Sequence, residues 1–152
     1  MPPPAPLFEW PVRIYYEDTD AGGLVYHARY LHFFERARTE WLRALGFEQA
    51  RLRGEQGILF AVRKMGLDFV RPAGLDQALR VTLSLAGHRR ASIDFEQWIL
   101  AAGDGHVCCR AEVNIACLDA EHLRPTRIPE AVLNALGAST DRGTNGDIAH
   151  GL

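Results

Sequence analysis

The spacing of apolar residues changes near the N-terminus of this chain, and the change separates a predicted strand from a predicted helix. Val12, Ile14 and Tyr16 alternate with the residues between them, which predicts a first strand. A second segment follows the strand and ends at Gly46, since glycine is a typical residue just after the end of a helix. In that segment apolar side chains recur at the spacing of an amphipathic helix: Tyr30, Phe33, Phe34, Ala37, Trp41, Ala44 and Leu45.

After this helix, alternation of period two dominates the chain. A short helix is expected first, from Glu48 to Arg53, with its end at Gly54. A last short helix, opened by Pro129, is expected from Glu130 to Leu136. Between them lie four alternating segments, over residues 64–69, 79–85, 93–99 and 107–117, separated by turns at 71–74, 87–90 and 103–105.

One long helix among strands joined by short turns predicts an α+β fold. The later strands must pair antiparallel, because short turns leave no room for crossover connections. The wide aromatic stripe of the helix needs a sheet to bury it. We therefore predict a curved five-stranded antiparallel sheet wrapped around one long central helix, as a single domain over residues 8–136. Residues 1–7 are predicted to be a disordered leader and residues 137–152 a disordered tail.

Composition narrows the class of protein. The 152 residues are 47% hydrophobic and 24% charged, which is ordinary for a soluble globular domain. A net charge of −2 argues against a general nucleic-acid binder. No apolar run approaches the roughly 20 residues of a membrane span, and the N-terminus lacks the pattern of a secretory signal. We expect a cytoplasmic protein with no nucleic-acid partner and no membrane span.

The cysteines and most histidines do not indicate a metal or disulfide site. Cys108, Cys109 and Cys117 lie in one alternating segment without metal-ligand spacing, so they are interpreted as packed, reduced thiols. His106 and His122 are isolated in the sequence, and no metal is expected.

The segment YYEDTDAGGLVYH, from Tyr15 to His27, carries the candidate chemistry. The carboxylate of Asp20 precedes the glycines Gly22 and Gly23, which let the backbone fold tightly, and His27 lies where the long helix begins. The first N–H groups of a helix lack internal partners and carry the positive end of its dipole. A carboxylate that faces such donors is suited to hydrolysis of an acyl group.

The same residues also have structural interpretations. Asp20 could cap a turn, a role that aspartate favours. Glu17 and Asp18 are expected to be exposed to solvent or locally hydrogen-bonded. The imidazole of His27 could orient water or substrate, in addition to the role of its amide. Tyr26 is more typical of packing than of catalysis. A Ser-His-Asp mechanism is not supported, because the nucleophile-elbow motif is absent.

Taken together, these motifs resemble those of a known family. The Asp20 segment is accompanied by FERARTEWL at 34–42, WPVR at 10–13 and VRKM at 62–65. This combination is similar to the hotdog-fold acyl-CoA thioesterases of the 4-hydroxybenzoyl-CoA thioesterase type. Within them the chain most resembles the YbgC branch, which is associated with the Tol–Pal envelope system of Gram-negative bacteria. The resemblance extends from about Phe8 to Pro129.

The resemblance implies an enzyme that hydrolyses an acyl-CoA thioester to a free acid and coenzyme A. It assigns Asp20 as the catalytic base or nucleophile and the His27 amide as the group that polarises the carbonyl. Arg89 and Arg90 match the place where some relatives hold coenzyme A phosphates. Gly23 and Tyr26 are the other expected substrate contacts.

For assembly, the resemblance implies a homodimer, often paired into a homotetramer. No cofactor is expected, since coenzyme A is part of the substrate, and acyl carrier protein is a second candidate partner. Two other functions stay open. A non-catalytic module that binds acyl thioesters or acyl carrier protein would tolerate loss of Asp20. A hotdog hydratase or dehydratase would pair a histidine with an acidic residue in a different motif context.

Overall fold

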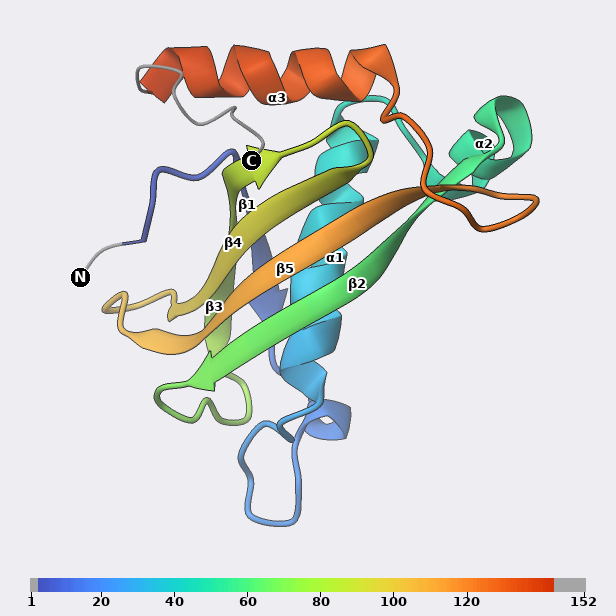
Figure 1. Ribbon diagram of the computed structural model, residues 1–152. Helices are drawn as coiled ribbons and strands as arrows, with labels where there is room; N and C mark the ends of the chain where they lie inside the picture. The colour runs from blue at the N-terminus through green and yellow to red at the C-terminus, as the bar shows by residue number, and fades with distance from the viewer. Residues whose placement is uncertain (1–2, 144–152) are drawn as a thin grey trace.

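A five-stranded antiparallel sheet curves around helix α1 (Arg29–Ala44) in the computed structural model, which describes residues 3–143 (Figure 1). The order of strands across the sheet is β1-β3-β4-β5-β2, so β1 and β2 form its two edges. The predicted α+β architecture is confirmed. The strands are β1 (Phe8–Arg13), β2 (Ile58–Phe69), β3 (Ala78–His88), β4 (Ser92–Ala101) and β5 (Val107–Asp119).

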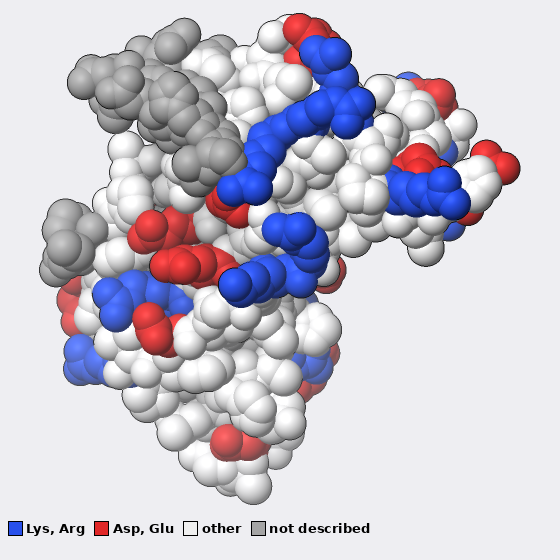
Figure 2. Space-filling model, in the orientation of Figure 1, with Lys and Arg blue, Asp and Glu red and all other residues white. Residues whose placement is uncertain are grey.

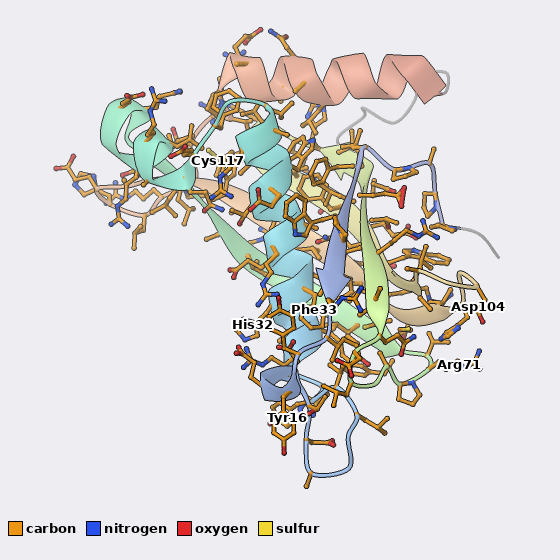
Figure 3. All side chains as sticks on the ribbon, turned by 180° about the vertical axis from the view of Figure 1, so that it is seen from behind. Tyr16, His32, Phe33, Arg71, Asp104 and Cys117 are labelled. Atoms are coloured by element: carbon orange, nitrogen blue, oxygen red, sulfur yellow. The ribbon has the colours of Figure 1, made fainter. Side chains whose placement is uncertain are left out.

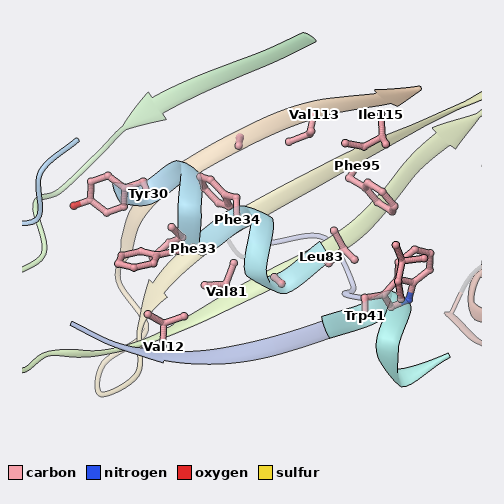
Figure 4. Packing of buried hydrophobic residues seen from close by; sticks show 14 of the residues in the cluster. Val12, Tyr30, Phe33, Phe34, Trp41, Val81, Leu83, Phe95, Val113 and Ile115 are labelled. Carbon is pink, nitrogen blue, oxygen red and sulfur yellow. The ribbon is translucent and has the colours of Figure 1, made fainter. Parts of the chain in front are cut away.

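The aromatic stripe of α1 packs on the concave face of the sheet (Figure 4). Trp41 meets Phe95 of β4 edge-to-face, with ring centroids 5.5 Å apart. Burial of each such side chain contributes about 1.5–3 kcal/mol, which fixes the helix on the sheet. The buried residues of the helix are Tyr30, Phe33, Phe34, Ala37, Trp41 and Leu42.

The C-terminal end of the stripe differs from the prediction. Ala44 and Leu45 are exposed, whereas Leu42, which is not among the predicted apolar positions, is buried. Gly46 follows with φ of +93°, a left-handed backbone conformation that favours glycine, and the predicted helix stop is confirmed.

The first strand lies earlier in the sequence than predicted. β1 pairs with β3 along its whole length, and the last backbone hydrogen bond of this region joins the Ile14 amide to Gln77. Residues Tyr16–Asp18 then form a 3₁₀ turn (η1), so the predicted strand position of Tyr16 is wrong. The physical reason is local, because the Asp18 side chain accepts the Tyr15 amide and turns the chain away from the sheet.

The segment after α1 is helical for longer than predicted. A helical turn α2 (Gln49–Arg51) continues into a π-helical turn η2 (Leu52–Gln56). This helical segment ends at Gly57, which has φ of +65°, and not at Gly54 as predicted.

The segments before β1 and after β5 make further contacts and form a further helix in the described part of the chain. The Leu7 amide donates to the Leu83 carbonyl, and the Ser84 hydroxyl donates to Pro4, so part of the predicted leader lies along β3. Helix α3 (Glu130–Gly143) continues past the predicted end at Leu136, into the segment predicted to be a tail. The rest of that prediction, 144–152, lies outside the described residues. Over 3–143, none of the helices is both long and apolar enough to traverse a bilayer.

Candidate active site

Residues 18–26 form a small hairpin at the N-terminal end of α1 (Figure 1). At its base the Tyr26 amide donates to the Asp18 carbonyl at 2.9 Å. Thr19 and Val25 then form an antiparallel bridge, and the Asp20 amide donates to the Leu24 carbonyl at 2.8 Å. The glycine pair forms the tip. We call this segment the Asp20 hairpin.

The carboxylate of Asp20 is oriented by the tip of its own hairpin. Its Oδ1 accepts the amide of Gly22 at 2.9 Å and that of Leu24 at 3.3 Å. Among the described residues its Oδ2 has no hydrogen-bond partner, and the residue is exposed. The turn-capping interpretation is therefore correct for one oxygen, while the other remains available to a substrate or a water molecule.

Both glycines at the tip are needed, for different reasons. Gly23 has φ of +82°, which side chains other than glycine rarely adopt. At Gly22 a Cβ would lie 3.3 Å from Asp20 Oδ1, closer than most such contacts. The tip is thus shaped so that the backbone amides can approach the carboxylate.

Two alternatives were predicted for Asp18, exposure to solvent or a local hydrogen bond, and the structure excludes the first. It is 3% exposed, and its Oδ2 accepts the Tyr15 amide at 2.9 Å, so the local hydrogen bond is confirmed. Its Oδ1 is buried without a hydrogen-bond partner and lies 3.6 Å from Nε of Arg29. Glu17, by contrast, is exposed.

His27 lies directly before the helical part of the chain. Ala28 is the N-cap residue and already has helical backbone angles, with φ of −70° and ψ of −18°. Within the described part of the chain, the His27 amide has no hydrogen-bond acceptor. The His27 amide is therefore a donor left open at the positive end of the α1 dipole.

Aromatic rings surround the start of α1. The His27 ring contacts that of Tyr26, with centroids 4.5 Å apart, and meets Phe69 edge-on at 6.3 Å. Phe69 also lies 5.8 Å from the buried ring of Tyr30. Phe69 and Tyr26 are 57% and 49% exposed, so they present an apolar surface beside the Asp20 hairpin. Figure 2 shows few charged side chains at this end of the molecule.

The connection between β2 and β3 holds the hairpin from the other side. The Val25 amide donates to the Ala73 carbonyl at 2.8 Å, and Leu24 forms a bridge with Gly74. The hydroxyl of Tyr30 accepts the Ala73 amide at 3.2 Å, and burial raises the pKa of this phenol. Helix, hairpin and connection thus form one hydrogen-bonded unit.

Sequence reasoning missed Phe69 and Ala73 as neighbours of the site. The sequence feature that could have indicated them is the predicted turn at 71–74, because the residues at the end of a strand are placed to approach another element. Figure 3 shows the molecule from behind, with Tyr16 near the start of α1, Arg71 and Asp104 to one side of it, and Cys117 toward the opposite end.

Arg89 and Arg90 lie at the far end of the sheet from Asp20. β3 begins beside the connection that holds the hairpin and runs for 11 residues to the turn that carries both arginines. At about 3.3 Å per residue this strand spans roughly 35 Å. The Ile128 amide donates to the Arg90 carbonyl, which brings Arg127 into the same region. Within one chain these arginines are not beside Asp20.

A hydrogen-bonded polar pair under α1, Gln97 with Arg38, was also missed. Gln97 is fully buried at an inward position of β4, donates to the Phe34 carbonyl at 3.1 Å and accepts Nη1 of Arg38 at 3.0 Å. Burial lowers the pKa of the Arg38 guanidinium. Arg38 and Trp41 line a cavity of about 330 Å³ between α1 and the sheet. The signal was a glutamine at a position where the alternation expects an apolar side chain.

The three cysteines are buried and unpaired, as predicted. Burial raises the pKa of Cys109 to about 12 and that of Cys117 to about 11, and it also raises the pKa of Cys108. Thiols of this kind are protonated at neutral pH and are poor nucleophiles.

Comparison with known proteins agrees with this geometry. A family model described as the thioesterase-like superfamily matches residues 15–136. The chain is 46% identical over 125 residues to the acyl-CoA thioesterase YbgC of Haemophilus influenzae, with 82% of this chain and 90% of that protein covered. It is 44% identical over 127 residues to the acyl-CoA thioester hydrolase YbgC of Escherichia coli, with 84% and 93% covered.

A solved structure supports the fold as well. The crystal structure of a probable thioesterase from Bartonella henselae superposes with a TM-score of 0.74 at 40% identity, over 80% of this chain and 98% of that one.

Proposed function

The chain belongs to the thioesterase-like superfamily and, within it, to the YbgC acyl-CoA thioesterases, and from this premise we propose that Asp20 and the His27 amide carry out thioester hydrolysis. The observation that carries the proposal is the carboxylate of Asp20, held by two backbone amides with its Oδ2 left open. It lies in the hairpin that leads directly into α1.

In the proposed reaction the thioester carbonyl oxygen lies toward the His27 amide. Negative charge develops on this oxygen as the carbonyl is attacked, and a fixed N–H donor at the positive end of a helix stabilises it. Asp20 Oδ2 either takes a proton from the attacking water or attacks the carbonyl itself to give a mixed anhydride. The carbon–sulfur bond then breaks, and coenzyme A leaves as the thiol, taking its proton from Asp20 in the first route and from solvent in the second. In the second route water then hydrolyses the anhydride, which releases the acid and restores the Asp20 carboxylate. Each route uses one carboxylate and one amide donor.

The exposed rings of Tyr26 and Phe69 are suited to cover the acyl group or the pantetheine arm beside this carbonyl. Gly23 contributes through its backbone, because only glycine lets the tip fold with the Asp20 amide contacts intact. The identity of the acyl group is best approached by measurement across a panel.

Assembly as a homo-oligomer is part of the proposal. β2 is a 12-residue edge strand, and Val62 and Phe69 on it are 47% and 57% exposed. Long edges with exposed apolar residues are usually covered in stable proteins, and a second copy of β2 is a natural cover. Arg89 and Arg90 would then approach an Asp20 hairpin only from another copy of the chain. We propose a dimer that can pair into a tetramer.

We also propose a cytoplasmic location, in agreement with a substrate that is a coenzyme A ester. A link to the Tol–Pal envelope system and to acyl carrier protein is proposed on the YbgC relationship alone. The location, the envelope link and the carrier-protein partner are independent of the proposed chemistry, so the chemistry can be correct even if these assignments are wrong.

The test of the proposed function is release of free thiol from a panel of short, long, hydroxylated and aromatic acyl-CoA esters. We expect the wild-type protein to release thiol from at least one ester, and the Asp20→Asn variant to be inactive on it. Binding without release would favour the non-catalytic module, and conversion of a hydroxyacyl-CoA to an enoyl-CoA without thiol release would favour the hydratase or dehydratase.

A further inference from the structure

The one buried carboxylate of the Asp20 hairpin has no role in the proposed reaction. Over residues 3–137, the buried polar or charged side chains are those of Asp18, Thr82, Ser84 and Gln97, and Asp18 is the only acid among them. A carboxylate loses hydration when it is buried, so its retention calls for specific partners.

Asp18 contacts three parts of the chain at once. Its Oδ2 accepts the Tyr15 amide, which lies just beyond β1. Its backbone carbonyl accepts the Tyr26 amide and so closes the base of the hairpin. Its Oδ1 lies 3.6 Å from Nε of Arg29, the first residue of α1. Strand, hairpin and helix therefore meet at this one residue.

The contact with Arg29 is the one that bears on the reaction. Arg29 lies two positions after His27, and Asp18 lies two positions before Asp20. A brace between Asp18 and Arg29 thus ties the start of α1 to the hairpin at points close to both reacting groups. Its ends are buried to different degrees, since the side chains of Asp18 and Arg29 are 4% and 29% exposed. Attraction between charges is stronger in such a site than in open solvent.

Arg29 also holds the hairpin through Glu17, but in a different way. Its Nη2 donates to the Glu17 backbone carbonyl at 3.3 Å and lies 3.8 Å from the Glu17 carboxylate, which is 69% exposed. An ion pair in this setting contributes little. Glu17 therefore supplies a matched control, being a second carboxylate near the same guanidinium without burial.

We infer that Asp18 is a positioning residue that fixes the His27 amide relative to Asp20 through its contact with Arg29. The inference rests on the proposed function for its effect on turnover, and on the structure alone for its effect on local order. Orientation of reacting groups is sensitive, since a displacement of about 1 Å can cost about 100-fold in rate.

The test uses Asp18→Asn, which keeps an oxygen to accept the Tyr15 amide and removes the charge that faces Arg29. For the best acyl-CoA we expect kcat to fall by about 10- to 100-fold while KM stays within about threefold, because the lost contact orients the site without touching substrate. Glu17→Gln, the control, should keep kcat within about twofold of wild type, as expected for an exposed pair.

Arg29 provides a second arm that leaves the buried carboxyl in place. Arg29→Gln should lower kcat to a similar extent, and Arg29→Lys should recover part of the loss because it restores the positive charge. The double variant Asp18→Asn with Arg29→Gln should be no slower than the slower single variant, as expected when two residues act through one contact. Independent, multiplying losses would overturn the brace.

Hydrogen exchange supplies a readout that does not depend on activity. Backbone amides of residues 24–31 should exchange faster in Asp18→Asn and Arg29→Gln than in wild type and Glu17→Gln, with the amides of β3–β5 unchanged. Unchanged exchange at 24–31 would overturn the inference. So would faster exchange with kcat within about twofold of wild type, since a brace on the reacting groups must affect turnover. If wild type hydrolyses no acyl-CoA, the proposed function fails and the exchange result still decides whether the brace exists.

Discussion

Asp18 and Asp20 lie two positions apart in the same hairpin, yet one is buried and the other is exposed. Asp18 is 3% exposed and contacts the ends of β1 and α1, whereas Asp20 directs one oxygen at the amides of the hairpin tip and the other to solvent. The hairpin thus separates a carboxylate suited to support from one suited to chemistry. Neither position would serve for the other, because a reacting group needs access and a brace needs burial.

Replacement of Asp20 by asparagine should abolish turnover without unfolding the protein. The amide oxygen can still accept the Gly22 and Leu24 amides, so the hairpin should keep its shape. Loss of the base or nucleophile is expected to lower kcat on the best acyl-CoA by about 10³-fold or more. Thermal unfolding should stay close to wild type. Thiol release within about threefold of wild type would contradict the assignment of Asp20.

The wild-type protein allows a test of the route by which Asp20 acts. In single-turnover hydrolysis by wild type in ¹⁸O-water, cleavage of a mixed anhydride at the enzyme carbonyl leaves label in the Asp20 carboxylate. Attack by an activated water leaves all the label in the released acid. Label found by mass analysis in the peptide that contains Asp20 therefore identifies the anhydride route.

Replacement of Gly23 by valine should damage the site more than the fold. Gly23 has φ of +82°, which a β-branched residue strongly disfavours, although there is open space around it. The tip should rearrange and displace the amides that hold Asp20. We expect most of kcat to be lost, with a smaller change in thermal stability.

Gly57→Val is the matched control for this strain. Gly57 has φ of +65° and also has open space around it, but it lies before β2 and outside the hairpin. The Gly57→Val variant should lose stability because valine is strained at this positive φ, and its kcat should stay close to that of wild type. Full activity in the Gly23 variant, or equal losses of kcat in both, would show that the tip geometry is not specific to catalysis.

Local patterns predicted the elements of this fold well where one periodicity decided them. The stripe from Tyr30 to Trp41 and the left-handed stop at Gly46 are confirmed, because helix amphipathicity and glycine conformation are properties of a short segment. The end of β1 was placed wrongly. Tyr16 continues the alternation of Val12 and Ile14, and only the side chain of Asp18, which accepts the Tyr15 amide, ends the strand.

The candidate site was predictable in part for the same reason. Asp20, Gly23 and His27 are near one another in sequence, so one motif contains all three. Phe69 comes from the end of β2, and its contact with the His27 ring depends on how the sheet curves. The burial of Asp18 depends on Arg29 and on the end of β1 together, and no single period in the sequence encodes such a contact.

The buried thiols should resist alkylation in the native protein. Burial raises the pKa of Cys109 from 9.0 to about 12, which lowers its thiolate fraction at pH 8 by roughly 1,000-fold. Iodoacetamide at pH 8 should leave Cys108, Cys109 and Cys117 unmodified in the folded state and label all three in urea, as read by intact mass. Rapid labelling of the native protein would contradict this account of the core.

The same shifts predict how stability changes at high pH. A thiol whose pKa is higher in the folded than in the unfolded state contributes stability that is complete below the unfolded pKa and is lost as pH rises through the folded one. For Cys109 that window runs from 9.0 to about 12 and for Cys117 from 9.0 to about 11. The raised pKa of Tyr30 acts in the same direction. The urea concentration at the unfolding midpoint should therefore decrease as the pH is raised from 8.5 to 10.5. In a Cys109→Ala variant this decrease, taken from the variant's own midpoint at pH 8.5, should be smaller.

Replacement of both Arg89 and Arg90 by alanine should raise KM for acyl-CoA and leave kcat nearly unchanged. Coenzyme A carries its charge on the nucleotide, far from the reacting carbonyl, so contacts there hold substrate and transition state equally. Loss of one or two charge-assisted hydrogen bonds is expected to raise KM several-fold to about 30-fold. An acyl-pantetheine that lacks the nucleotide should show little change.

The position of this turn adds a condition to that prediction. Since β3 separates the arginines from the Asp20 hairpin of the same chain, their effect on KM requires a second copy. Mixed oligomers of Asp20→Asn chains with Arg89→Ala, Arg90→Ala chains test this directly. A site that combines Asp20 of one chain with both arginines of the other should have the wild-type KM, so the mixture should contain a fraction of sites with normal affinity. If every active site in the mixture keeps the raised KM, the arginines act within their own chain. Equal losses on acyl-CoA and acyl-pantetheine would instead mean that they support the fold.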